Sequence, residues 1–417
     1  MKTNTIKKTR RDLLKTVSFP FVAASTVRGA NDRVEIGFIG VGLRARWLLR
    51  REDMGTGRVV AMADINPAVL AETSRYQPDG QVWRPYHDYR RMFENEKLDA
   101  VFVETPTHAR ALICMHAMQA GLDVYAEKPV SLTVHEGQVL TKAARHYRRV
   151  LQVGTQQRSI PMNMFASRLV ETGKIGRIRK VIVCNFLPPE RWVPKPAQPK
   201  PPGLDWDQWC NQTELRPYHS ALHRGWSNYW DFDGGGQSWG VTGWGTHSLD
   251  QVQDALGTSL TGPVEIRLGD QSKVTLVYAN GAEVSLEQPK IDDHQQLGAI
   301  FQGTDGEIQI LRGDFKTNRP ELRQGAPEPT KEGPGESTPH VRNFVECIRS
   351  RQLPNADVEI GHRSTVVCHL VNICREVGRT SLAWDPKVER FHGPGADEAN
   401  AKLSRPRRKG YELPSIG

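Results

Sequence analysis

Two glycines, an alanine and an aspartate near the start of the chain have the spacing of a dinucleotide-binding turn. Gly40, Gly42 and Ala45 follow a short apolar run, and a helical pattern comes after them. Gly40 permits a tight turn, Gly42 lets the backbone approach a pyrophosphate, and Ala45 allows a helix to pack closely on a strand. Asp64 ends the next apolar run, 24 residues after Gly40, where it can bond both hydroxyls of a ribose. These four residues predict an NAD site.

The nucleotide expected at this turn is NAD in preference to NADP. The charge of Asp64 would repel the 2′-phosphate of NADP, whereas Arg44 leaves NADP open as the weaker alternative. Val41 and Leu43 complete the turn, and the N-terminus of the following helix offers free N–H groups to the phosphates. The alternative without a nucleotide is a glycine-rich turn beside an ordinary surface aspartate.

The elements that must position these residues are alternating strands and helices. This alternation over residues 31–153 predicts an α/β fold, a doubly wound parallel sheet of the Rossmann type. A strand over 100–104 leads into Thr105, Pro106 and His108. Because the carboxyl ends of parallel strands face the ligand crevice, these three residues are expected along the cofactor. His108 could equally cap the helix that follows.

Four segments of the chain are similar to one known family. They are Glu127-Lys128-Pro129, which follows a strand of the Rossmann unit, and the segments 153–158, 301–306 and 340–362. Together they make the chain resemble the Gfo/Idh/MocA oxidoreductases over nearly the whole mature length. The resemblance implies NAD(P)-linked chemistry on sugars, inositols and related polyols, with Glu127 and Gln156 among the cofactor-binding residues.

The second domain is predicted to be α+β, with a large open and mostly antiparallel sheet. The apolar runs 273–278 and 283–287 flank Asn280-Gly281, which is a strong hairpin signal. Another pair of runs flanks Asp305-Gly306.

The predicted organisation is a signal peptide over 1–30, the NAD-binding domain over 31–153, a substrate and oligomerisation domain over 154–384, and a tail over 385–417.

Lys128 is the residue that could best move a proton. A lysine at the carboxyl end of a cofactor-side strand can donate to, or accept from, a hydroxyl beside the nicotinamide, if its neighbours lower its pKa. The alternative is a solvated lysine at the end of a strand. The resemblance adds a histidine beside the reacting carbon, and in this chain that histidine is His247.

His247 and Asp250 lie three residues apart at the start of a predicted helix, hence on one face of it. The resemblance makes His247 the residue that relays or stabilises the substrate proton, with Asp250 orienting it or binding a hydroxyl. The alternative is that the pair only caps the helix. Many relatives carry an aspartate where this chain has Gly243. Either another acid, such as Asp231 or Asp233, replaces it, or the chemistry is not a plain alcohol oxidation.

An aromatic insertion over 187–244 holds seven of the ten tryptophans. Flat aromatic faces pair with the C–H faces of pyranose rings, and neighbouring polar groups can bond sugar hydroxyls. The tryptophans could instead anchor a long loop to the sheet, and both roles are expected in this segment. The residues predicted to bind a small-molecule sugar or polyol are Arg158, Arg224, Trp230, Trp244 and His247.

Residues 1–30 resemble a twin-arginine export signal. Arg10 and Arg11 precede two leucines and a short uncharged run that contains small residues. This pattern predicts export of the folded protein to the periplasm by the twin-arginine (Tat) machinery, and the alternative is a basic disordered tail. Because little free nucleotide exists outside the cytoplasm, a dehydrogenase located there is expected to keep its NAD bound.

Charge and cysteine content argue against other classes of function. Residues 1–30 carry six of the nine net positive charges and residues 402–410 hold five basic side chains, which leaves −2 for the remainder. A near-neutral body lacks the basic surface that nucleic-acid binding requires. No apolar run has the length of a membrane span. The six cysteines show no CxxC pair and no spacing with histidine typical of zinc, so no metal site is expected.

The leading functional hypothesis is hydride transfer between bound NAD and a hydroxyl of a sugar, glycoside or polyol. A second hypothesis is a redox-neutral reaction, in which transient oxidation lets a glycosidic bond eliminate before the hydride returns. A third is a nucleotide-bound binding protein without turnover. The open sheet, by analogy with the family, also predicts a homo-oligomer.

Overall fold

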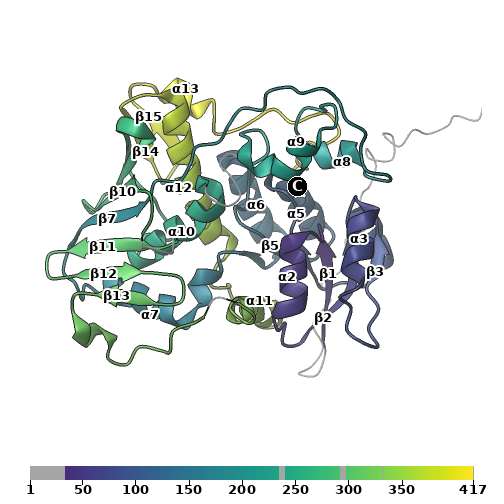
Figure 1. The fold of residues 1–417 in the computed structure, drawn as a ribbon, viewed down its shortest axis with the longest axis horizontal. Helices are drawn as coiled ribbons and strands as arrows, with labels where there is room; N and C mark the ends of the chain where they lie inside the picture. The colour runs from purple at the N-terminus through teal and green to yellow at the C-terminus, as the bar shows by residue number, and fades with distance from the viewer. Residues whose placement is uncertain (1–32, 234–239, 292–296, 332, 417) are drawn as a thin grey trace, which may run out of the picture.

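The computed structural model describes residues 33–233, 240–291, 297–331 and 333–416. Within these residues the chain forms two sheets with helices packed on them, and an irregular segment crosses from one sheet to the other (Figure 1). The predicted export signal over 1–30 lies outside the described residues, so it stays a prediction. Trp239, one of the seven tryptophans of the insertion, also lies outside them.

The first sheet is the doubly wound parallel sheet that the sequence predicts. Its six strands have the order β3-β2-β1-β4-β5-β6, and all neighbouring pairs are parallel. The order reverses between β1 and β4, which is where a ligand crevice opens in such sheets. The strands are β1 (Val34–Ile39), β2 (Gly57–Ala63), β3 (Arg84–Tyr86), β4 (Ala100–Val103), β5 (Asp123–Ala126) and β6 (Leu151–Val153).

Helices pack on the two faces of this sheet, so β4 and β5 are buried along their whole length. Phe38 of β1 and Phe102 of β4 stack at 4.7 Å, and Phe344 meets Phe102 edge-on at 5.6 Å. The segment assigned to the second domain therefore contributes α11 to this core. The helices that pack here are α2 (Leu43–Arg51), α3 (Pro67–Ser74), α4 (Tyr89–Asn95), α5 (Thr107–Gln119), α6 (Val134–His146) and α11 (Thr338–Ser350).

The second sheet is mixed and mostly antiparallel, as predicted. Its nine strands have the order β13-β12-β11-β7-β10-β9-β8-β14-β15, and only β7 and β10 pair in parallel. The expected hairpin at Asn280-Gly281 joins β9 to β10, with Gly281 at φ +83°. The strands are β7 (Ile178–Cys184), β8 (Glu265–Leu268), β9 (Val274–Val277), β10 (Glu283–Gln288), β11 (Ala299–Gly303), β12 (Glu307–Ile310), β13 (Phe315–Thr317), β14 (Ser381–Asp385) and β15 (Arg390–His392).

Three helices pack against the second sheet and form one apolar cluster with it. They are α7 (Pro161–Glu171), α10 (Thr246–Ala255) and α12 (Val358–Val377). Helix α10 follows directly on a π-helical turn over Val241–Gly245. Helix α10 contacts α7 and α12, and His247 at its start lines a cavity that Lys128, at the end of β5, also lines.

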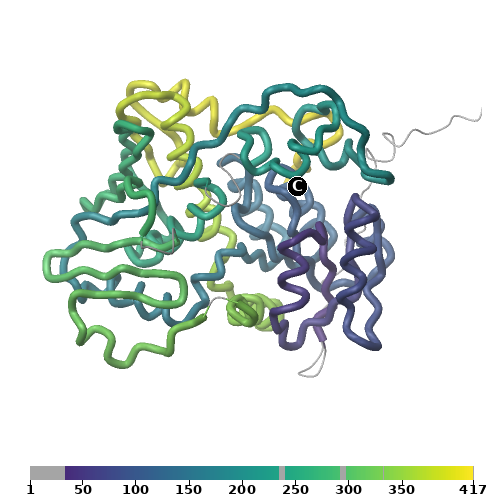
Figure 2. Tube along the Cα trace, viewed as in Figure 1, coloured from purple at the N-terminus to yellow at the C-terminus, as the bar shows by residue number. Residues whose placement is uncertain are grey.

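The aromatic insertion lies across the carboxyl-terminal edge of the first sheet (Figures 1 and 2). It contains the short helices α8 (Trp206–Cys210) and α9 (Ser220–Gly225) and its own apolar cluster, against which Ile65 of the first domain packs. The backbone N–H of Asp205 donates to Ile65 O at 3.1 Å. The tail fastens this segment, since Arg408 Nε donates to Asn211 O at 3.0 Å and Leu413 packs on the first domain.

No helix among the described residues is long and apolar enough to cross a membrane. Within the same ranges, no group of three or more histidine, cysteine and acidic side chains is arranged to hold a metal ion.

Candidate active site

The glycine turn has the geometry that a dinucleotide requires. Gly40 adopts φ +80°, and a Cβ at this position would lie 2.8 Å from Cγ2 of Thr105, so only glycine fits. A Cβ on Gly42 would meet nothing within 4 Å. Ala45 is buried against the sheet, whereas Leu43 is 80 % exposed beside the open space. The turn therefore leaves room for a pyrophosphate in front of the first N–H groups of α2.

Asp64 lies at the end of β2 and faces the same turn. Its carboxylate accepts hydrogen bonds from the backbone N–H of Val41 and of Asn66, both at 2.9 Å. Burial raises the pKa of Asp64 to about 6, although the two N–H donors oppose that shift. The structure thus places this acid next to the glycine turn, as the ribose-binding role requires.

A cavity of about 360 Å³ lies between the two sheets. It brings together most of the predicted side chains that carry chemistry. Of the predicted residues, it is lined by Arg44, Thr105, Glu127, Lys128, Gln156, Trp244 and His247. Residues that were not predicted also line it, namely Trp47, Glu104, Thr107, Arg110, Trp226, Leu297, Arg312 and Glu336.

Lys128 extends from the end of β5 towards the start of α10. Its Nζ donates a hydrogen bond to Gly243 O at 3.1 Å. Burial lowers the pKa of Lys128, and the charges of Glu127 and Asp233 partly restore it. A lysine with a lowered pKa holds a larger fraction of neutral amine near neutral pH, as a general base needs.

His247 lies in the first turn of α10 and is 6 % exposed. Burial, together with the positive charge of Lys128, holds the pKa of His247 well below its usual value. Its Nδ1 is buried and has no hydrogen-bond partner among the described residues. A neutral imidazole that faces the same cavity as Lys128 can bond a substrate hydroxyl.

Of the two acids considered in place of the one missing at Gly243, the structure brings Asp233 to the cavity. Asp233 is 2 % exposed and accepts hydrogen bonds from the hydroxyls of Thr107 and Thr242, the latter at 2.7 Å. Burial raises its pKa, while Lys128 is among the groups that oppose the shift. Asp231 instead pairs with Arg216 at 2.6 Å and does not line this cavity.

Glu127, which precedes Lys128, lines the same cavity and accepts several hydrogen bonds. Its Oε1 accepts from Arg44 Nε at 2.7 Å and from Gln156 Nε2 at 3.1 Å, and its Oε2 accepts from the backbone N–H of Lys128 at 3.0 Å. These bonds hold Arg44 and Gln156 on the wall of this cavity. Glu127 therefore positions its neighbours and leaves Lys128 directed into the cavity.

Asp250 and Arg158 do not take the places predicted for them. Arg158 Nε donates to Asp250 at 2.9 Å, and the Ser364 hydroxyl donates to the same carboxylate at 2.6 Å. The two residues form a buried ion pair, and neither lines the cavity. The three-residue spacing puts His247 and Asp250 on one face of α10, but their side chains turn to different partners.

Three more predicted residues lie elsewhere. His108 is buried beneath the insertion, where its Nε2 bonds to Trp209 O at 2.6 Å. It therefore joins the insertion to α5 and does not line the cofactor crevice. Trp230 lies under the guanidinium of Arg405, 4.4 Å from its ring centre, and lines a different cavity. Arg224 is exposed and lines none of the described cavities.

Replacing Asp250 by asparagine is expected to lower the free energy of unfolding by about 2 kcal/mol, because the buried guanidinium of Arg158 would lose one of its two carboxylate partners and keep only Asp254, at 2.8 Å. Urea unfolding measures the loss, and NADH titration of the folded variant is expected to give an unchanged dissociation constant. A variant of full stability with lost turnover would instead support the predicted role of Asp250 in orienting His247.

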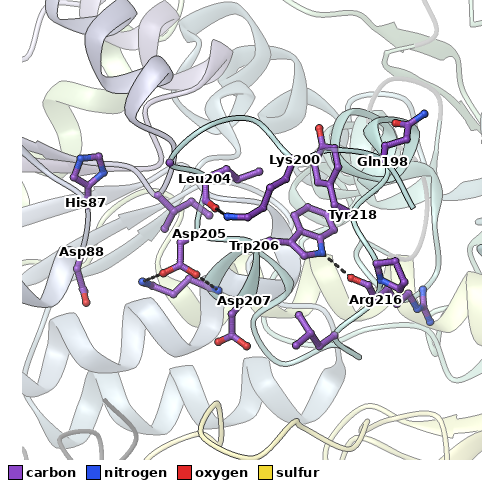
Figure 3. A pocket seen from close by; sticks show the side chains of 15 residues that line it. His87, Asp88, Gln198, Lys200, Leu204, Asp205, Trp206, Asp207, Arg216 and Tyr218 are labelled. Carbon is purple, nitrogen blue, oxygen red and sulfur yellow. Dashed lines mark hydrogen bonds between the residues drawn. The ribbon is translucent and has the colours of Figure 1, made fainter. Parts of the chain in front are cut away.

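A second cavity, of about 880 Å³, lies between the first sheet and the insertion. Ile65, His87 and Asp88 contribute its wall at the carboxyl ends of β2 and β3, and Trp206 and Tyr218 contribute the wall of the insertion (Figure 3). Ile65 directly follows the ribose-binding candidate Asp64. The insertion therefore covers the edge of the sheet on which the adenosine end of a dinucleotide lies.

Comparison with known proteins identifies the family. Residues 34–155 match the family model described as "Oxidoreductase family, NAD-binding Rossmann fold", and residues 167–413 match "Oxidoreductase family, C-terminal alpha/beta domain". The chain belongs to the Gfo/Idh/MocA oxidoreductase family, and its first domain is an NAD-binding Rossmann domain.

Two curated relatives align with part of the chain. An uncharacterized oxidoreductase, YrbE of Bacillus subtilis, is 26% identical over 223 residues, which are 52% of this chain and 57% of that protein. Levoglucosan dehydrogenase of Pseudarthrobacter phenanthrenivorans is 29% identical over 118 residues, 28% of this chain and 29% of that enzyme. The alignments thus span little more than half of the first relative and less than a third of the second.

Solved structures share the fold over most of the chain. The WlbA dehydrogenase of Bordetella pertussis, in complex with NADH and UDP-GlcNAcA, has a TM-score of 0.60 and 19% identity over 85% of this chain and 98% of that one. The aldose-aldose oxidoreductase of Caulobacter crescentus has a TM-score of 0.58 and 19% identity over 84% and 99%. At these identities the likeness establishes the two-domain architecture.

Proposed function

We propose that this protein is an NAD-dependent oxidoreductase that acts on a hydroxyl of a sugar, glycoside or polyol. The observation that carries the proposal is that the amine of Lys128 and the imidazole of His247 line one cavity at the carboxyl edge of the NAD-binding sheet. The fit for NAD rests on the open space over Gly42 and on the placement of Asp64. NAD bound there supplies the acceptor for a hydride.

The residues of the chain supply the proton chemistry. In the oxidising direction, neutral Lys128 takes the proton of the substrate hydroxyl as the C–H hydride leaves the same carbon. His247, which is neutral, bonds the hydroxyl and holds the carbon in line. In the reducing direction, protonated Lys128 returns the proton to the forming alkoxide. Proton transfer of this kind contributes about 10²- to 10⁴-fold in rate.

The lining of the cavity supports a polyhydroxylated substrate. Trp226 and Trp244 offer aromatic faces, while Asp233 and Arg312 offer hydrogen-bonding groups at the same cavity. Small cavities with a few fixed polar groups among apolar walls orient ligands of this kind. The similarity to a levoglucosan dehydrogenase and to an inositol 2-dehydrogenase supports the same substrate class.

A redox-neutral reaction is the second candidate, and one observation favours it. The insertion and the tail pack across the edge where the adenosine end of NAD would lie, so exchange of the nucleotide would require them to move. An enzyme that retains NAD can oxidise a glycoside, let the glycosidic bond eliminate, and return the hydride to the product. The twin-arginine pattern in residues 1–30 would export the folded protein, which is consistent with an enzyme that retains its NAD.

The test is to purify the mature protein, denature it and identify any released nucleotide by mass, and then to incubate the native protein with sugars, polyols and glycosides. We expect close to one NAD per chain. Net NADH formation supports the first reaction, and cleavage of a glycoside without net NADH supports the second. Bound NAD without any conversion would favour a binding protein, and failure to bind even added NAD would contradict all three.

A further inference from the structure

Glu104 is a half-buried acid that no part of the proposed mechanism uses. It directly follows β4, and it lines the cavity that contains Lys128 and His247. Both of its carboxyl oxygens are buried without a hydrogen-bond partner among the described residues. A polar group that is removed from water without a hydrogen bond costs free energy. Such an acid, placed on a cavity wall, is positioned to hydrogen-bond a ligand.

Two further groups on the same wall share this property. Nη2 of Arg44 and Oγ1 of Thr105 are also buried and have no hydrogen-bond partner in the described part of the chain. Arg44 comes from the first turn of α2, and Thr105 from the residue next to Glu104. One donor, one hydroxyl and one carboxyl without partners thus line one cavity. By contrast, the neighbouring acid Glu127 has its hydrogen bonds satisfied within the chain.

The strand order of the first sheet defines where Glu104 lies relative to the glycine turn and Lys128. Glu104 follows β4, which lies between β1 and β5. The glycine turn after β1 would hold the pyrophosphate of NAD, and Lys128 after β5 lines the same cavity as Glu104. A Cβ on Gly40 would touch Thr105, so the end of β4 adjoins the glycine turn directly. The part of NAD between the pyrophosphate and the nicotinamide is the ribose that joins them, and Glu104, at the end of the strand between β1 and β5, would face that ribose.

The surroundings of Glu104 also set its protonation. Burial, and the negative charge of Glu127, raise the pKa of Glu104 well above its usual value, while Arg44 and Arg110 oppose the shift. Burial and Glu127 therefore favour the protonated form of this carboxyl. A neutral carboxyl both donates and accepts a hydrogen bond, which complements a ribose hydroxyl that does the same.

We propose that Glu104 is a cofactor-binding residue that hydrogen-bonds, as a neutral carboxylic acid, a hydroxyl of the ribose next to the nicotinamide of NAD. Arg44 and Thr105 complete this subsite. The inference rests on the NAD-binding domain and not on the proposed substrate, so it stands or falls independently of the sugar chemistry.

Two variants of the full mature chain test the protonation state, after charcoal treatment to remove retained nucleotide. Glu104→Gln keeps a neutral donor and acceptor, and NADH titration is expected to give a dissociation constant within about threefold of the parent. Glu104→Ala is expected to weaken NADH binding about tenfold, the equivalent of one lost hydrogen bond. Equal weakening in both variants would show that the charge is required and would overturn the proposal, as would an unchanged constant for Glu104→Ala.

Two fragments of the cofactor test the position of the subsite. ADP-ribose contains the second ribose, whereas ADP lacks it. Glu104→Ala is expected to weaken ADP-ribose about as much as NADH and to leave ADP unchanged. A loss for ADP of the same size would reveal a general disturbance of the glycine turn and would overturn the assignment. The matched control is Glu94→Ala on α4, where the exposed Glu94 pairs with Arg91 at 2.6 Å, and it is expected to leave all three constants unchanged.

Discussion

Replacing Lys128 by methionine is expected to lower kcat about a thousandfold while the dissociation constant for NADH stays within a few-fold of the parent. Methionine has a similar length and fills the same space, but it cannot accept or donate the proton. The parent enzyme is expected to oxidise its substrate faster as pH rises through the pKa of Lys128, which burial lowers. In the methionine variant that pH dependence should disappear. Steady-state rates over a pH series and NADH titration measure both effects.

The matched control for this prediction is Lys142→Met on α6, where the lysine is exposed. It is expected to leave rate, pH profile and NADH binding unchanged. A Lys128→Met variant that keeps its rate and its pH profile would remove Lys128 from the proton chemistry. His247, which lines the same cavity, would then be the candidate for the proton transfer, although its lowered pKa favours the neutral form.

The parts of the fold that the sequence predicts well are those that local geometry determines. Gly40 has a positive φ and a Cβ there would clash with Thr105, and Gly281 has a positive φ directly after the turn at Ala279-Asn280. In both places the backbone conformation follows from the residue type, so a pattern of a few residues suffices. The alternation of strands and helices then fixes the parallel sheet.

Contacts between distant segments set the limits of sequence-based prediction. Helix α11 follows the second sheet in the chain, yet Phe344 packs on Phe102 in the first sheet. An amphipathic helix shows that one face will be buried, but not which sheet will bury it. The position of the tail could not be predicted for the same reason, because the hydrogen bond from Arg408 to the insertion joins residues about two hundred positions apart.

The same reasoning explains the candidate site. Lys128 and His247 line one cavity, as predicted, because Lys128 comes just after the end of β5 and His247 lies at the start of α10. Asp250 was predicted from its spacing, whereas its actual partner Arg158 is 92 residues away. Glu104 was not predicted, although the sequence carries a pattern that could have indicated it. Like Asp64, it is an acid at the end of an apolar strand of the parallel sheet.

Replacing Asp233 by asparagine is expected to shift the acid limb of the kcat/KM profile to lower pH by about one unit. The negative charge of Asp233 raises the pKa of Lys128. Removing that charge therefore lowers the pKa of the lysine. A less basic lysine is also a weaker base, and the plateau rate is expected to fall about tenfold. The pH dependence of initial rates measures both changes.

Asp231→Asn is the matched control, since this acid lies two residues earlier and its carboxylate pairs with Arg216 outside the cavity. It is expected to leave the acid limb in place. If Asp233→Asn also left it in place, the charge at position 233 would not act on Lys128. A shift confined to Asp233 would have a wider consequence. With Gly243 offering only a backbone carbonyl to the lysine, the acid that sets the basicity of Lys128 would come from the aromatic insertion, so substrate binding and base strength would depend on the same segment.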